Sequence, residues 1–166
     1  MNRLSLATVV SMLFFPALAT IAGADEPHPF SIHDMLAMER ISDHQVSPDG
    51  KQIVFVLRTT DLEANKGRTD LWLVGVDGTG LRRLTTHPDA DNNPRWTPDS
   101  KSIFFISTRS RSSQVWRIAV EGGEAQKVTS EPLDVGNLVI SPDGKQIAYS
   151  MEVFPDASPA ETKERL

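Results

Sequence analysis

Short apolar stretches separated by polar turns recur along the chain. In one set, apolar residues follow one another without alternation, which is typical of strands with both faces buried. In a second set the stretch ends at a glycine-containing turn, which indicates a hairpin. The first set is 53–57, 103–106 and 147–149, and the second is 70–76 and 114–120. The pattern predicts short antiparallel strands joined by tight turns.

A repeated heptapeptide precedes the strands of the first set. Ser-Pro-Asp-Gly-Lys-Gln-Ile occurs at 47–53 and at 141–147, with a degenerate copy at 97–103. Proline presets the backbone at the second turn position, aspartate can bond its own backbone, and glycine permits the exit conformation. Each copy therefore predicts a tight turn that leads into a strand.

The spacing of the copies defines the repeat unit. The first and second turns are 50 residues apart and the second and third are 44 apart. Three other pairs of matched residues are also 44 apart: Trp72 and Trp116, Gly78 and Gly122, and Thr85 and Thr129. The unit is therefore 44 residues long, and the first copy carries six extra residues, which we place in the polar stretch 59–68.

Four short strands in about 40 to 45 residues are typical of a β-propeller blade. We therefore predict an all-β fold, a partial β-propeller of about two and a half four-stranded blades with a short N-terminal helix. The repeats occupy 43–154, in the segments 43–85, 92–129 and 134–151. The alternative is a generic antiparallel sandwich whose hairpins resemble one another by chance.

The two flanks of the repeats predict helices. Residues 31–40 form a short amphipathic stretch capped by Ser31, which we expect to cover the first sheet. Residues 155–166 read as a truncated connector, in which Ser158, Pro159 and Glu161 mark the start of a helix.

The N-terminus has the features of a secretory signal. A positive start is followed by a short apolar core and by small residues that end at Ala24, so we expect a signal peptide over 1–24, cleaved before Asp25. A membrane anchor is disfavoured, because polar residues and Pro16 interrupt the apolar run. The segment 25–42 then leads to the repeats. The expected location is periplasmic or secreted, with no stable membrane anchor and, in the absence of cysteine, no disulfide.

Charge and length narrow the function further. The net charge is −5 and no block of Lys and Arg forms a basic stretch, so nucleic acid is a poor candidate partner. A closed propeller needs at least about four blades. The chain holds too few repeats for closure, and we expect it to be a fragment of a longer protein.

The chain resembles the N-terminal part of secreted prolyl oligopeptidase-type (S9) serine peptidases, which include acylaminoacyl peptidases and dipeptidyl peptidases. The resemblance covers most of the chain after residue 24. It lies in Asp34-Met35-Leu36, the three Pro-Asp turns, Pro94-Arg95-Trp96, Gly122-Gly123-Glu124 and 151–156. It implies a propeller that stands beside an α/β-hydrolase domain and admits peptide substrates to a Ser-Asp-His triad.

A second family uses similar turns. TolB-type periplasmic propellers also carry Pro-Asp-Gly repeats, but they place a separate α/β domain before the propeller. Residues 25–46 are too few for such a domain, so the peptidase family is preferred. A TolB-like propeller that binds a protein partner remains the alternative.

The chain itself contains no catalytic pattern of a serine hydrolase. The Gly-x-Ser-x-Gly elbow that exposes the nucleophile does not occur, and no histidine pairs with an activated serine in sequence. The four histidines, His28, His33, His44 and His87, are interpreted as surface or helix residues. We therefore assign no catalytic residue and treat only the full-length parent as a hydrolase.

Three other patterns suggest ligands but fit structural roles better. The run Asp89-x-Asp91-x-Asn93 lacks the glycine and the glutamate of a calcium loop and is interpreted as a polar connector. The three tryptophans are interpreted as core residues, and Gly78-x-Gly80 as a hairpin turn. No cofactor or metal is expected.

The meander also predicts which loops lie together. In an up-and-down blade, the loop between the second and third strands and the connector to the next blade lie at one end. The stretches 59–68 and 86–92 should therefore share one end, with the Ser-Pro-Asp-Gly turns at the other. We expect the end with the insertion to make the more specific contacts.

Overall fold

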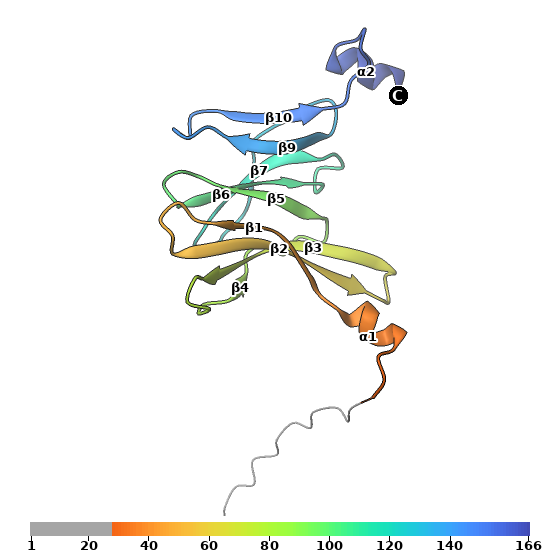
Figure 1. The fold of residues 1–166 in the computed structure, drawn as a ribbon. Coiled ribbons are helices and arrows are strands. Elements are labelled where there is room, and N and C mark those ends of the chain that lie inside the picture. Colours follow the sequence, from red (N-terminus) through yellow and green to blue (C-terminus); the bar gives the residue numbers. More distant parts are fainter. Residues whose placement is uncertain (1–27) are drawn as a thin grey trace, which may run out of the picture. The chain divides into compact units, whose positions relative to one another are not determined.

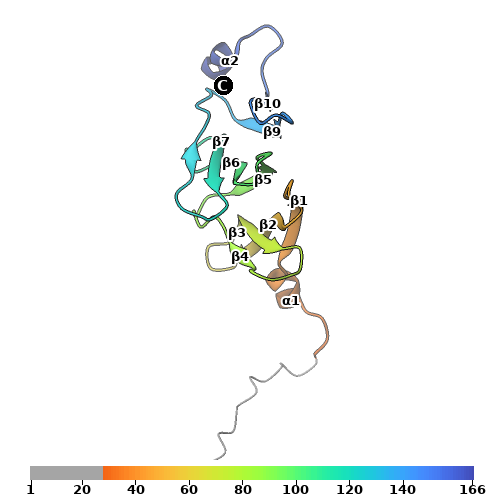
Figure 2. The same cartoon turned by 90° about the vertical axis from the view of Figure 1, so that its left-hand side faces the viewer.

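The computed structural model describes residues 28–166, and the predicted signal peptide with its cleavage site between Ala24 and Asp25 lies outside them. Three antiparallel sheets follow one another in chain order (Figure 1). We call them blades 1, 2 and 3. Each is a meander in which consecutive strands pair, and the view from the side shows the sheets in succession (Figure 2). The prediction of an all-β, partial propeller fold is confirmed.

Blades 1 and 2 each have four strands, and blade 3 has two within the described residues. Blade 1 consists of β1 (Arg40–Val46), β2 (Gln52–Asp61), β3 (Lys66–Gly75) and β4 (Arg82–Arg83). Blade 2 consists of β5 (Asp91–Trp96), β6 (Ser102–Ser107), β7 (Gln114–Ala119) and β8 (Gln126–Lys127). Blade 3 consists of β9 (Val135–Ile140) and β10 (Ile147–Met151).

The six-residue insertion lengthens one hairpin. In blade 1, β2 and β3 have ten residues each and pair without interruption from Gln52–Gly75 to Asp61–Lys66. In blade 2, β6 and β7 have six residues each. The predicted stretch 59–68 is the outer part of the β2–β3 hairpin, so the insertion extends regular strands rather than a loose loop.

The repeated turns form as predicted. In the first, Gly50 N donates to Ser47 O at 2.8 Å, and Ser47 N donates to Gln52 O at 2.8 Å. The fourth turn residue has a positive φ in every copy: 70° at Gly50, 58° at Ser100 and 69° at Gly144. Glycine is favoured there because this backbone region is strained for residues with a Cβ.

The core lies between the sheets. The leading face of a blade is the sheet face turned toward the blade before it, and the trailing face is turned toward the blade after it. The trailing face of blade 1 packs against the leading face of blade 2, and the trailing face of blade 2 packs against blade 3. The first cluster is Val54, Val56, Leu71, Leu73, Leu84, Trp96, Ile103, Phe105, Ile118 and Val120. The second includes Ile106, Val115, Val135 and Leu138.

The first strand of each blade is bent at one position. Asp43, Asn93 and Asn137 have positive φ angles of 43°, 54° and 51°. They are spaced by the same 50 and 44 residues as the turns, and a register shift occurs at each. These are β-bulges, which raise the local twist and redirect side chains.

The start of the first strand differs from the prediction. We expected it at 43, within the repeat 43–85, but β1 begins at Arg40, where Arg40 pairs with Arg58. The lengthened β2 offers these extra partners. The bulge at Asp43 breaks the alternation of apolar and polar residues, so the sequence pattern gave no sign of a strand on both sides of it.

The helices begin where the capping residues predict. The first, α1 (Ile32–Ala37), is capped by Ser31 with Asp34 as its reciprocal partner, and α2 (Pro159–Arg165) is capped by Ser158 with Glu161. Helix α1 is six residues long, not ten, and none of its residues is buried, so it can cover only a small part of the first sheet.

Candidate functional site

Antiparallel pairing divides the loops of the blades between two ends. The Pro-Asp turns and the β3–β4 turn lie at one end, which we call the turn end. The β2–β3 and β6–β7 hairpin loops and the connectors between blades lie at the other, the hairpin end. At this end Thr108 N, after β6, donates to Ala90 O in the connector at 3.2 Å.

The aspartates of the three Pro-Asp turns accept hydrogen bonds from groups within their own turns. Asp49 Oδ1 accepts from Ser47 Oγ at 2.6 Å and from Lys51 N at 3.1 Å. Asp99 and Asp143 make the same two contacts in their copies. The hydroxyl bond first and the backbone bond second lower the pKa of all three carboxyls. These groups therefore act as turn-forming residues.

At the hairpin end, the tip of the long β2–β3 hairpin carries a half-buried ion pair. Asp61 Oδ2 accepts from Arg68 Nε at 2.9 Å and from Nη2 at 2.8 Å, and Asp61 Oδ1 accepts from Ala64 N at 2.9 Å. The Ala64 bond and the Arg68 bond lower the pKa of Asp61. Leu62 is 58% exposed at this tip. The hairpin thus presents a fixed polar edge with one apolar side chain.

A buried ion pair joins the β6–β7 loop of blade 2 to the start of β5. Both carboxylate oxygens of Asp91, which is fully buried, accept from Arg109 Nη2 at 2.8 and 2.7 Å. The Arg109 guanidinium also lies over the rings of Phe105 and Trp116, at 5.3 and 5.0 Å from their centroids. The Arg109 guanidinium thus contacts a carboxylate and two aromatic rings, and we assign it a structural role.

Blade 1 contains a buried carboxyl that is less well satisfied. Asp70 is buried, and its Oδ2 accepts from Arg83 Nη2 at 2.7 Å, whereas its Oδ1 has no partner. Burial raises the pKa of Asp70 and outweighs the lowering effect of Arg83. Among the described residues, this is the carboxyl whose pKa is raised.

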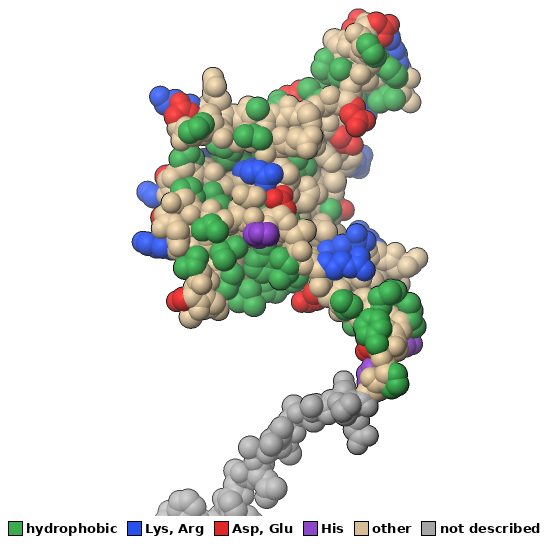
Figure 3. Space-filling view, viewed as in Figure 1, with side chains coloured by type: hydrophobic (Ala, Val, Ile, Leu, Met, Phe, Trp, Pro, Cys, Tyr) green, Lys and Arg blue, Asp and Glu red, His purple; other side chains and the backbone are tan. Residues whose placement is uncertain are grey.

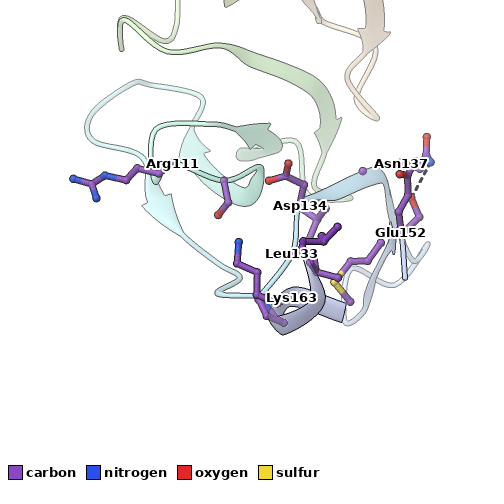
Figure 4. A pocket seen from close by; sticks show the side chains of 13 residues that line it. Arg111, Leu133, Asp134, Asn137, Glu152 and Lys163 are labelled. Atoms are coloured by element: carbon purple, nitrogen blue, oxygen red, sulfur yellow. Dashed lines mark hydrogen bonds between the residues drawn. The ribbon is translucent and has the colours of Figure 1, made fainter. Parts of the chain in front are cut away.

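A cavity also lies at the hairpin end. It measures about 530 Å³ and is bordered by the β6–β7 loop, the connector before β9, the end of β10 and α2. Figure 4 shows Leu133 and Asp134 on one side of it and Lys163 of α2 on another, with the Arg111 guanidinium directed away. Its size falls within the range of small-ligand sites, but Asp134 is used to bind Ser113 N at 2.6 Å.

Helix α2 stands where the repeat predicts a strand. A 44-residue shift of β7 falls on 158–163, which form the N-cap and most of α2. Two features depart from the 44-residue unit: the long β2–β3 hairpin and α2. They therefore affect the same part of a blade. They place extra surface at the hairpin end and none at the turn end.

The histidines lie on or near the surface, as the sequence interpretation held. His28, His33 and His44 are exposed and His87 is half-buried. His87 Nδ1 accepts from Asp89 N at 3.1 Å. No serine hydroxyl is bonded to a histidine in the hydrogen bonds of residues 28–166.

Two of the three tryptophans pack in the core. Trp96 is buried and its Nε1 donates to Gln45 O at 3.0 Å, while Trp116 is partly buried against the same cluster. Trp72 is half-buried on the leading face of blade 1, so the core interpretation does not hold for it. Gly78 and Gly80 lie in the β3–β4 turn as predicted, both with positive φ.

The connector interpretation of 89–93 was wrong for its second half. Asp91 and Asn93 belong to β5, where Asp91 binds Arg109 and Asn93 Oδ1 accepts from Leu138 N at 3.0 Å. Sequence reasoning missed this role of Asn93. The signal was present, because Asp43, Asn93 and Asn137 share the spacing of the turns.

Residues 28–166 show neither a metal site nor a membrane-crossing helix. No group of three His, Asp or Glu side chains in this range is placed to hold a metal ion. Neither helix in it has the length and apolar character that a membrane crossing requires.

Comparison with known proteins gives matches in two groups. Dipeptidyl-peptidase 5 of Porphyromonas endodontalis is 32% identical over 131 residues, which is 79% of this chain and 18% of that protein. The Tol-Pal system protein TolB of Anaeromyxobacter dehalogenans is 40% identical over 50 residues, which is 30% of this chain and 10% of that protein. The chain thus spans less than a fifth of the curated relatives that it matches.

A solved structure supports the fold. The acylaminoacyl peptidase of Pyrococcus horikoshii superposes with a TM-score of 0.59 at 19% identity, over 74% of this chain and 20% of that one. Together with the match to dipeptidyl-peptidase 5, it confirms the resemblance to the propeller part of prolyl oligopeptidase-type peptidases. The family described as the TolB β-propeller domain matches residues 40–154, and the chain belongs to this family.

Proposed function

We propose that this chain is the non-catalytic, N-terminal propeller part of an exported prolyl oligopeptidase-type serine peptidase. Its partner is the α/β-hydrolase domain of the parent protein. Its hairpin end takes part in selecting or gating the peptide substrates that reach that domain.

The length of the dipeptidyl-peptidase 5 match carries this proposal. The match covers 79% of the chain, which is more than the propeller family segment 40–154. It must therefore include residues outside the repeats, where similar turns cannot account for it. The TolB relative matches over 50 residues, a length that the repeats alone can supply.

The distribution of elaborated loops supports the gating role. The long β2–β3 hairpin, α2 and the cavity of about 530 Å³ all lie at the hairpin end. The carboxylates of the turn end are engaged in their own turns. Binding residues are disproportionately found on loops that a rigid scaffold positions, which favours the hairpin end as the contacting surface.

The coding sequence that follows residue 166 gives the direct test. We expect further repeats and then a Gly-x-Ser-x-Gly elbow with a later Asp and His. The whole product should hydrolyse dipeptidyl chromogenic substrates and lose activity with a serine-directed phosphonate. A matched variant with the elbow serine replaced by alanine should be folded and inactive.

A TolB-like propeller that binds a protein partner is the alternative, and the family match and the TolB relative favour it. In that case the repeats would complete a propeller with no hydrolase elbow after it. The product would then release no chromophore from any dipeptidyl substrate, and the peptidase proposal would be abandoned.

A further inference from the structure

The extra length of the β2–β3 hairpin leaves part of the trailing face of blade 1 uncovered. Alternate residues of a strand point to the same face. Along β2, Val54 and Val56 are buried against blade 2, whereas the next two residues of this face, Arg58 and Thr60, are exposed. The reason is that β2 has ten residues and β6 of blade 2 has six. This surface is therefore open with blade 2 in place beside it.

Two arginines lie next to each other on this uncovered surface. Arg40 of β1 is directly opposite Arg58 of β2, and both side chains are exposed. Residues directly opposite in an antiparallel pair point to the same face, with Cβ atoms about 4.5–5.5 Å apart. Figure 3 shows Lys and Arg side chains gathered at the hairpin end of blade 1, beside α1. We call Arg40 and Arg58 the arginine pair.

The arginine pair has no protein partner within residues 28–166. Neither guanidinium makes a hydrogen bond or an ion pair in this range, and Thr69 Oγ1, on the residue opposite Arg58 in β3, is buried without a partner. The carboxylates of nearby strands are engaged by other arginines: Asp43 by Arg95, Asp61 by Arg68 and Asp91 by Arg109.

The arginine pair also lowers the stability of the sheet that carries it. Like charges directly opposite each other in a sheet are destabilising, and no carboxylate in the described part of the chain neutralises either of them. Proteins violate such local rules chiefly at functional sites. The pair is therefore better explained by a ligand than by a structural role.

Gly67 holds one of the two guanidinium groups in place. A Cβ added to Gly67 would lie 2.7 Å from both Nε and Nη2 of Arg58. The guanidinium thus lies against the backbone of β3, in the space that a side chain at position 67 would fill. A group that is held before binding loses less conformational entropy when a ligand arrives, so the site is partly preorganised.

We propose that the arginine pair binds a carboxylate of the peptide substrate, so that the parent peptidase selects acidic peptides. A guanidinium group presents its donors in a planar fork that matches the two oxygens of a carboxylate. The pair lies at the hairpin end, the surface to which we assign substrate selection. This inference rests on the proposed peptidase function and names the class of substrate that it selects.

Pairs of peptides that differ by one charge test this site in the whole peptidase. In each pair a glutamate replaces a glutamine at one position, and one further pair has a free or an amidated C-terminus. We expect kcat/KM to be about three- to tenfold higher for the charged member of one pair. This ratio should arise through KM and should fall as salt is added, because the guanidinium groups are exposed. Arg40→Gln and Arg58→Gln should each bring the ratio close to one.

Two further variants separate the position of the charge from its presence. Lys66→Gln removes the same charge from the same hairpin, but Lys66 pairs with Asp61 on the other face, so the ratio should stay at the wild-type value. Gly67→Ala keeps every charge and displaces the Arg58 guanidinium, so it should lower the ratio as Arg58→Gln does. Residues 58, 66 and 67 are exposed, and these variants should unfold at the same denaturant concentration as the wild type.

The outcomes separate this inference from the function on which it rests. A parent that hydrolyses neutral peptides, but has the same kcat/KM for both members of every pair, would overturn the carboxylate site and leave the peptidase proposal intact. An unchanged ratio with a lower melting temperature for Arg58→Gln would assign the pair to a carboxylate of the hydrolase domain, and would also overturn it. A product that hydrolyses no peptide would refute both proposals.

Discussion

Blades 1 and 2 share one repeat but occupy different surroundings. Blade 2 is covered on both faces, and its Phe105 is fully buried and lies beneath the Arg109 guanidinium. Blade 1 has a neighbouring sheet on its trailing face only, and on its leading face Val46 is more than half exposed although Phe55 and Leu57 are buried. The repeat therefore fixes which positions face a neighbour, and the neighbour decides how much packing energy each position contributes.

The two blades also carry different polar side chains at the same buried position of the repeat. In blade 2, Gln114 is fully buried and its amide binds Thr129 Oγ1, Glu131 N and Leu133 O. In blade 1 the same position is Asp70, which is too short to make these bonds and relies on Arg83. Arg83 Nε then binds Thr85 O at 2.9 Å. The neutral amide satisfies its surroundings fully, whereas the ion pair leaves Asp70 Oδ1 unpaired.

The largest expected difference between the blades concerns their matched phenylalanines. Phe105→Ala should lower the free energy of unfolding by about 3–5 kcal/mol, since it leaves a cavity between packed sheets. Phe55→Ala should cost less, because Phe55 keeps 8% of its surface exposed and no sheet lies beyond it, whereas Phe105 is fully buried. Urea unfolding of the two variants measures both values. Equal losses would show that the leading face of blade 1 is as tightly packed as that of blade 2.

The loss of stability on breaking an ion pair should differ nearly as much between the buried pair Asp91–Arg109 and the more exposed pair Asp61–Arg68. Asp91→Ala leaves the Arg109 charge buried without a partner, which costs about 3–5 kcal/mol. Arg68→Ala breaks a pair whose side chains are 37% and 27% exposed, and should cost less than about 1 kcal/mol. Thermal and urea unfolding of both variants decide this. A small loss for Asp91→Ala would mean that water reaches Arg109 in the folded protein.

A smaller difference in stability is expected between substitutions at two of the bulge residues. Asn93→Ala and Asn137→Ala both place alanine at a positive φ, so the backbone penalty is shared. Asn93→Ala also removes the acceptor of Leu138 N, and should cost about 1 kcal/mol more. Urea unfolding of the two variants gives the difference. If Asn137→Ala proves the more harmful, the Asn93 bond does not join blades 2 and 3.

The smallest effect is a pH dependence from Asp70. Burial raises its folded-state pKa above 3.8, so the folded protein holds this proton more tightly than the unfolded chain. The stabilisation is present below 3.8 and is lost as the pH rises through the raised pKa. Asp70→Asn has no proton to lose. Its stability relative to the wild type should therefore increase with pH, as urea unfolding at several pH values will show.

A flat difference between wild type and Asp70→Asn, or one of opposite sign, would contradict the assigned cause. The turn carboxyls Asp49, Asp99 and Asp143 have lowered pKa values. They contribute stability above 3.8 that is lost as the pH falls. Both proteins contain them, so their effect cancels in the comparison.

Much of the fold could be predicted because its signals are local. The Pro-Asp turns, the apolar second strands and the capping residues Ser31 and Ser158 each act within a few residues of sequence. The 44-residue spacing also placed the insertion within 59–68. The spacing predicts structure because residues at equivalent positions of a repeat make equivalent contacts.

The rest depends on contacts between residues far apart in sequence. The ion pair of Asp91 with Arg109, and the bond from Leu138 N to Asn93, join elements 18 and 45 residues apart. Nothing near Asp91 or Asn93 reveals these partners. The start of β1 at Arg40 was missed for a similar reason, since the bulge at Asp43 hides the strand pattern.

Shortening the β2–β3 hairpin in the proposed longer parent protein tests the central functional claim most directly. Removal of 59–61 and 66–68 takes out three paired rows, keeps the 62–65 turn and gives the hairpin the length found in blade 2. If the hairpin end selects substrates, the ratio of kcat/KM for a long peptide to that for a dipeptidyl substrate should rise, with unchanged thermal stability. A folded, active enzyme with an unchanged ratio would contradict the claim.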